Sequence, residues 1–208
     1  LHSTVFATIP LVEWSVVRRA HAVAQELTSR YPDDVESWYT LGEARYHFGS
    51  RVGSSPRQAL EAFDRAIAHD SSFAPAYIHP VELALWLEGP EAARRYARTY
   101  LALGPTGVSA SGMELIGQVL EAGDTQPQRV RNLLREASPD VLDDALAAFR
   151  HFMDPGETAV AVARALAASP VEDVKSSTKQ DRERRVGTAL LFRGHVHDGA
   201  RILFQNPG

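Results

Sequence analysis

The sequence predicts an all-α protein in which about five helical hairpins stack into a right-handed α-solenoid. Apolar and small residues recur at helical spacing; for example, Ala59, Phe63 and Ala66 fall on one face of a helix. Residues that cap helices recur in front of prolines along the chain and mark helix starts. No run of alternating Val, Ile or Thr lies between turn residues, so no strand is expected.

Helix starts are predicted where a side chain can accept from the free backbone N–H groups of a first turn. Asp33 with Glu36 fits the reciprocal capping pattern, and so does Ser55, with Pro56 at the first helical position and Gln58 at the third. Cap-competent residues also precede proline at Gly89-Pro90, Ser138-Pro139, Asp154-Pro155 and Ser169-Pro170.

These starts divide the chain into a leading helix at 11–29 and five hairpins. The predicted pairs are 34–48 with 56–69, 75–88 with 90–103, 110–122 with 127–137, 139–152 with 155–168, and 181–193 with 198–205. Their spacing is typical of stacked helical repeats, so residues 1–208 are interpreted as a single repeat domain. The segment 171–180, with SSTKQ at its centre, is predicted to be a connection.

Composition excludes several classes of function. The chain has 22 Lys and Arg against 26 Asp and Glu, a net charge of −4 that gives no long-range attraction to nucleic acid. It has no cysteine, which removes disulfides and thiolate catalysis and leaves the compartment open, with the cytoplasm slightly favoured. The longest uncharged run, 99–113, is too short and too rich in Gly to span a membrane. The start lacks Met, so we expect part of a longer protein.

The sequence offers little catalytic chemistry, and no catalytic residue, metal or cofactor is predicted. There is no HExxH motif, and Gly107 to Ser111 approaches a nucleophile elbow but lacks the final glycine. His195 and His197 lie beside Asp198, where a metal site is the alternative to a solvated turn between two helices. We interpret them as such a turn.

One stretch resembles the tetratricopeptide repeat (TPR) signature. The resemblance is carried by Trp38, Leu41, Gly42, Ala59, Phe63 and Ala66. It is best in 34–69 and 75–103, while 110–205 keeps only the hairpin rhythm. Gly42 is expected to let the second helix approach closely at Ala59. The resemblance implies a helical-repeat fold, similar to the repeat regions of larger bacterial signalling proteins.

The same resemblance implies a concave groove that binds a protein or peptide, without enzymatic activity. Aligned on the family, the groove-facing positions are Glu36, Tyr39, Glu43, Tyr46, His47, Ile78, Glu82, Leu85 and Trp86. The aromatic and acidic character of these residues favours a basic peptide, with Glu43 and Glu82 as the recognition groups. Two alternatives stay open: Tyr46, Leu85 and Trp86 as core, and a small enzyme or ligand sensor in the solenoid hollow.

Overall fold

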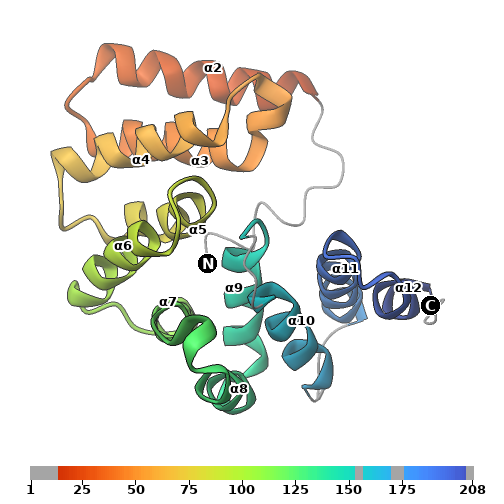
Figure 1. The fold of residues 1–208 in the computed structure, drawn as a ribbon. Coiled ribbons are helices and arrows are strands. Elements are labelled where there is room, and N and C mark those ends of the chain that lie inside the picture. Colours follow the sequence, from red (N-terminus) through yellow and green to blue (C-terminus); the bar gives the residue numbers. More distant parts are fainter. Residues whose placement is uncertain (1–13, 153–156, 170–175, 205–208) are drawn as a thin grey trace.

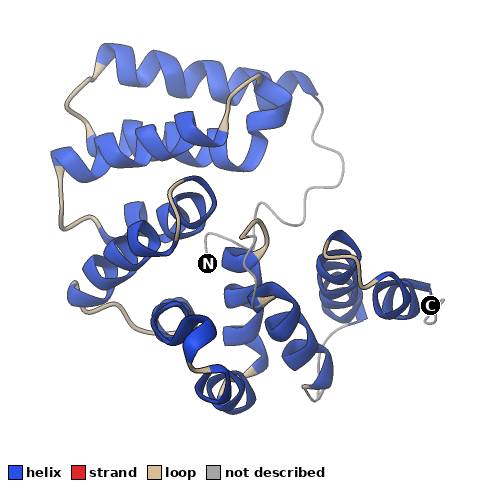
Figure 2. Ribbon diagram, in the orientation of Figure 1, coloured by secondary structure: helices blue, strands red, loops and turns tan. Residues whose placement is uncertain are grey.

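The computed structural model describes residues 14–152, 157–169 and 176–204, and its regular elements there are helices (Figures 1 and 2). In chain order they are α2 (Trp14–Arg30), α3 (Val35–Val52), α4 (Pro56–His69), the 3₁₀ turn η1 (Ala74–Tyr77), α5 (Ile78–Leu87), α6 (Pro90–Ala102), α7 (Val108–Ala122), η2 (Gly123–Thr125), α8 (Pro127–Glu136), α9 (Pro139–Phe149), α10 (Thr158–Ala168), α11 (Ser176–Phe192) and α12 (Val196–Phe204). The all-α prediction is confirmed. None of the helices within these ranges has the length and apolar character needed to cross a membrane.

The helix starts follow the predicted capping chemistry with one shift. At α4 the Ser55 side chain accepts from the backbone N–H of Gln58, and the Gln58 side chain accepts from the backbone N–H of Ser55, which confirms the capping box. At α3 the cap is Asp34 rather than Asp33. Its Oδ2 accepts from Ser37 N at 2.8 Å and also from the Ser37 hydroxyl, so Ser37 decides between the two adjacent carboxylates.

Several predicted boundaries in the second half of the chain are wrong by a few residues. SSTKQ is not a connection, because α11 begins at Ser176; an ion pair of Lys179 with Glu183, at 3.7 Å and i,i+4 spacing, spans the predicted start. Similarly, α7 begins at Val108, after Gly107 with φ of 91°. The pair Asp154-Pro155 and residues 170–175 lie outside the described residues.

The first hairpin shows why small residues recur in the sequence. A Cβ added at Gly42 would lie 2.7 Å from Cδ1 of Phe63, whose side chain is fully buried. The atoms nearest to Gly42 thus belong to the Phe63 ring of the second helix. Ala59 and Ala66 are themselves fully buried, as their spacing predicted.

The hairpins follow one another around an arc (Figure 1), and the arc closes on itself at α9. This helix packs against α7, its neighbour in the stack, and also against α5. A Cβ at Gly112 of α7 would lie 3.0 Å from Cβ of Asp144, so the missing side chain allows α9 to come this close. The first helices of four successive hairpins, α3, α5, α7 and α9, consequently face a shared interior space.

Candidate functional site

The interior of the arc holds a cavity of about 680 Å³, lined by α3, α5, α7 and α9. Its wall includes the following residues that the sequence predicted to face a partner: Glu36, Tyr39, Glu43, Tyr46, His47, Ile78 and Glu82. They share a surface because spacings of three, four and seven residues return to one face of a helix. The predicted groove-facing set is thus brought together with few exceptions, and its role in binding stays a prediction.

Trp86 and Leu85 do not line the cavity. Leu85 is 2% exposed and belongs to the core, which settles that alternative for this residue. Trp86 is 45% exposed, but its ring stacks on His151 with centroids 4.5 Å apart. It lies one helical turn beyond Glu82, where the chain leaving α9 covers that face of α5.

Glu82 is not free to meet a partner, contrary to expectation. It is 6% exposed, and its Oε1 accepts from Nη2 of Arg150 at 2.7 Å. The hydroxyl of Tyr46 donates to Oε2. Burial, and then the negative charge of Glu82, raise the pKa of Tyr46, so this hydroxyl keeps its proton. Glu82 on α5 thus connects Tyr46 on α3 to Arg150 at the end of α9 through partly buried hydrogen bonds.

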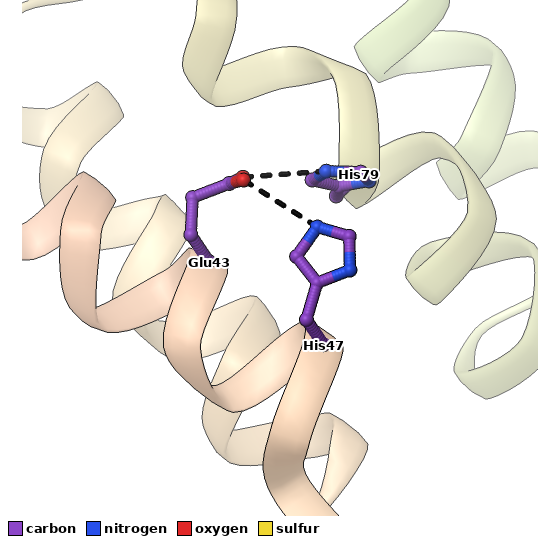
Figure 3. Close-up of side chains that lie close together, drawn as sticks. All are labelled: Glu43, His47 and His79. Atoms are coloured by element: carbon purple, nitrogen blue, oxygen red, sulfur yellow. Dashed lines mark ion pairs between the residues drawn. The ribbon is translucent and has the colours of Figure 1, made fainter. Parts of the chain in front are cut away.

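Glu43 is likewise buried and engaged, by two histidines. His47 lies one turn further along α3, and His79 comes from the start of α5; all three side chains point toward one another (Figure 3). The His47 Nε2 lies 3.6 Å from Oε2 of Glu43, and the His79 Nε2 lies 3.3 Å from Oε1. Burial opposes ionisation of Glu43, but the nearby imidazoles of His47 and His79 outweigh it and lower the pKa of Glu43 to about 2.

Two carboxylates of the cavity lining have no hydrogen-bond or ion-pair partner among the described residues, and they lie on opposite walls of the cavity. Glu36 on α3 is exposed, and Asp144 on α9 is half-buried. Burial, followed by the charge of neighbouring Asp143, raises the pKa of Asp144. No Lys or Arg belongs to the described cavity lining, so the wall is acidic overall.

Aromatic and apolar side chains fill the rest of the lining. The Tyr39 ring meets the Phe73 ring edge-on, with centroids 5.3 Å apart. Met113 and Ile116 of α7 form the facing wall. The sequence did not indicate Phe73, Met113 or Ile116, because they come from a loop and from a repeat without a recognisable signature.

His79 and Asp144 were also missed, although each had a signal in the sequence. His79 directly follows Ile78, which the sequence predicted to face the groove, and Glu43 with His47 already has the i,i+4 spacing that places two donors on one helix face. Asp144 lies against Gly112, a small residue within a helix, and such residues often mark a close approach.

The turn with His195 and His197 shows no comparable grouping. His195 Nε2 lies 3.1 Å from Glu157 Oε1, whereas the side chain of His197 is 93% exposed. Among the described residues, the one set of three His, Asp or Glu donors close enough to share an ion is Glu43, His47 and His79.

Comparison with known proteins adds a likeness of fold. No protein-family model matches the chain, and no curated protein matches it. Among solved structures it is similar to YrrB, described as a TPR protein with an unusual peptide-binding site, at 13% identity over 90% of this chain and 95% of that one, with a TM-score of 0.47. A likeness at this level assigns neither a ligand nor a residue role here. The helices and contacts described above form a stack of helical hairpins.

Proposed function

We propose that this chain is a non-enzymatic binding module that takes a basic peptide segment of a protein partner in the cavity between α3, α5, α7 and α9. The observation that carries the proposal is the acidic lining, which holds four carboxylates and no Lys or Arg among the described residues. We assign different roles to these carboxylates from the contacts that each one makes. Glu43 and Glu82 hold the site together, while Glu36 and Asp144 are available to pair with a cation of the ligand.

Aromatic groups in the wall suit the same ligand. Tyr39 and Phe73 offer half-buried rings beside the exposed Glu36. Rings add contact area at low entropic cost and attract the alkyl stems and cationic heads of Lys and Arg. A peptide that alternates Lys or Arg with apolar residues therefore fits both chemistries of the cavity.

The proposal is tested with fluorescently labelled peptides rich in Lys and Arg, measured against sequence-matched peptides in which Glu replaces each basic residue. The double variant Glu36→Gln/Asp144→Asn removes two charges and keeps the side-chain shapes. At about 0.2–1 kcal/mol for each exposed charge pair, its affinity for the basic peptide should fall about 2–30-fold, with a weaker dependence on salt.

A matched control changes the net charge equally at a distance from the cavity. Glu61 on α4 and Glu136 on α8 are exposed and outside the cavity lining, so Glu61→Gln/Glu136→Gln should leave affinity unchanged. Equal binding of basic and acidic peptides, or equal losses in the two double variants, would refute the proposal.

A small-ligand sensor is the second candidate, and one observation favours it. The titratable side chains converge on one cavity instead of spreading along an open groove, and about 680 Å³ lies within the usual size range of small-molecule sites. The two candidates separate in a thermal-shift screen: a small metabolite that raises the melting temperature, in a chain that binds no basic peptide, would select the sensor.

A further inference from the structure

We propose that Glu43, His47 and His79 form a binding site for a divalent transition-metal ion, with Zn²⁺ as the ion that fits best. The ligand atoms are the two imidazole Nε2 atoms and one carboxylate oxygen, and all lie within 4.8 Å of one another (Figure 3). The site lies inside the cavity wall and joins two successive hairpins, since two ligands come from α3 and one from α5.

The spacing of the donors matches what an ion would impose. Two ligands about 2.0–2.1 Å from a tetrahedral Zn²⁺ lie roughly 3.3–3.4 Å apart. His79 Nε2 lies 3.3 Å from Oε1 of Glu43, and His47 Nε2 lies 3.6 Å from Oε2 of the same carboxylate. One donor atom from each residue lies within 4.8 Å of the other two, so side-chain rotations that shorten these separations would place the three donors around one centre.

Hydrogen bonds alone do not satisfy the buried polar atoms of this cluster. Oε1 of Glu43 has less than 1 Å² of exposed surface and no hydrogen-bond partner, although His79 Nε2 is 3.3 Å away. A buried carboxylate oxygen without a hydrogen bond is costly. A cation between the carboxylate and the imidazoles would satisfy this oxygen, and Glu43 as a whole is only 9% exposed.

Surrounding side chains hold the imidazole rings in place. The ring of Tyr46 stacks on His79 with centroids 3.9 Å apart, and Phe63 supports the same ring at 5.8 Å. Such outer contacts orient metal ligands and increase affinity.

The donor set selects the class of ion. Two imidazoles with one carboxylate suit Zn²⁺ and its transition-metal neighbours, whereas Mg²⁺ and Ca²⁺ prefer oxygen ligands. Three protein ligands leave a position open toward the cavity. A donor group on a bound molecule, such as a carboxylate or an imidazole, could complete the coordination there.

The test is titration of the chelator-treated chain with ZnCl₂ by calorimetry, in the absence of any peptide. We expect one Zn²⁺ per chain, no competition from excess Mg²⁺, and a higher melting temperature with Zn²⁺. With Co²⁺, visible absorption should report low-symmetry coordination that includes nitrogen ligands. In the unmodified protein, NMR should show the ring resonances of His47 and His79 shifting together on addition of Zn²⁺.

Variants then locate the ion. His47→Gln and His79→Gln should each weaken Zn²⁺ binding by more than about 100-fold, because changes to outer contacts alone typically cost about 10–100-fold in affinity. His69→Gln is the matched control, because His69 is exposed and lies outside the donor cluster. His197→Gln examines the turn in the same way, and both controls should bind Zn²⁺ as the unmodified chain does.

Three results would overturn the proposal: absence of stoichiometric binding, binding that survives both ligand variants, or binding that disappears in His197→Gln. The NMR measurement decides the matter if a ligand variant fails to fold, since unshifted His47 and His79 rings in the unmodified chain would also refute it. The titration involves no peptide, so its failure would leave the proposed peptide binding intact.

Discussion

Replacing Arg150 by Ala is expected to destabilise the protein several times more than replacing Arg30 by Ala. Both side chains form close ion pairs: Arg150 Nη2 lies 2.7 Å from Glu82, and Arg30 Nη2 lies 2.6 Å from Glu26. The pairs differ in burial, because the Glu82 side chain is 7% exposed and that of Glu26 is 56% exposed. This contrast isolates the effect of burying a carboxylate.

The expected magnitudes follow from that burial. Without Arg150, Glu82 stays in a poorly hydrated place, and among the described residues the Tyr46 hydroxyl is its remaining hydrogen-bond partner. Hydrogen bonds to charged groups contribute about 1.5–3 kcal/mol, but the Arg150 side chain is itself 55% exposed and water would replace part of its contribution. We therefore expect a loss of about 1–3 kcal/mol for Arg150→Ala, against about 0.3–0.5 kcal/mol for the exposed helical pair at Arg30.

Thermal unfolding followed by circular dichroism measures the difference, at roughly 2–4 °C per kcal/mol for a chain of this size. In a Glu82→Gln background the charge is gone, so Arg150→Ala should then cost little. Two results would show that the contribution of Arg150 to stability does not depend on the buried carboxylate. One is an equal loss of unfolding free energy for Arg150→Ala and Arg30→Ala, and the other is the same loss for Arg150→Ala with and without the Glu82 charge.

Three further predictions concern the packing, the caps and the pH dependence. Gly42→Ala should destabilise the protein by about 1–2 kcal/mol, because the added methyl group overpacks against Phe63. Gly117→Ala should stabilise it by about 0.5–1 kcal/mol, because Gly117 lies within a helix and has open space around it. Equal urea unfolding midpoints for the two variants would contradict this prediction. Asp34→Ala should cost about 1 kcal/mol and Asp33→Ala nearly nothing, as urea unfolding would show, and the reverse order would restore Asp33 as the cap. Burial lowers the pKa of His21, so the folded state binds fewer protons than the unfolded state and stability is lost as the pH falls below about 6.5. His21→Gln should therefore reduce the dependence of the melting temperature on pH between about pH 5 and 8. An unchanged dependence would refute the assignment to His21.

Local signals in the sequence were enough to predict the helices and one wall of the cavity. Capping at Ser55 depends on residues three apart, and the buried face of α4 depends on positions such as Ala59 and Phe63. The inward face of α3 is what the resemblance to the TPR signature implied. Asp34 was missed as the α3 cap because Asp33 fits the same pattern, and Ser37 makes the difference.

Contacts between distant parts of the chain account for what the sequence did not predict. Glu82 and Arg150 are 68 residues apart, so nothing near Glu82 indicated that its charge would be paired inside the protein. The meeting of His79 with Glu43 depends on how α5 packs beside α3, and the placement of Asp144 depends on the approach of α9 to α7. Periodicity indicates which face of a helix is inward, but it does not identify the residue across the gap.

The contact between α5 and α9 has a mechanical consequence. In an open array of repeats each unit touches only its neighbours, so the array extends like a spring and can fray one unit at a time from an end. Here α5 also packs against α9. Force applied to the N-terminal hairpins is therefore transmitted to the C-terminal half through this contact as well as through the succession of neighbouring hairpins. The segment from α5 to α9 should behave as a stiff closed loop, with more compliance in the helices that precede and follow it.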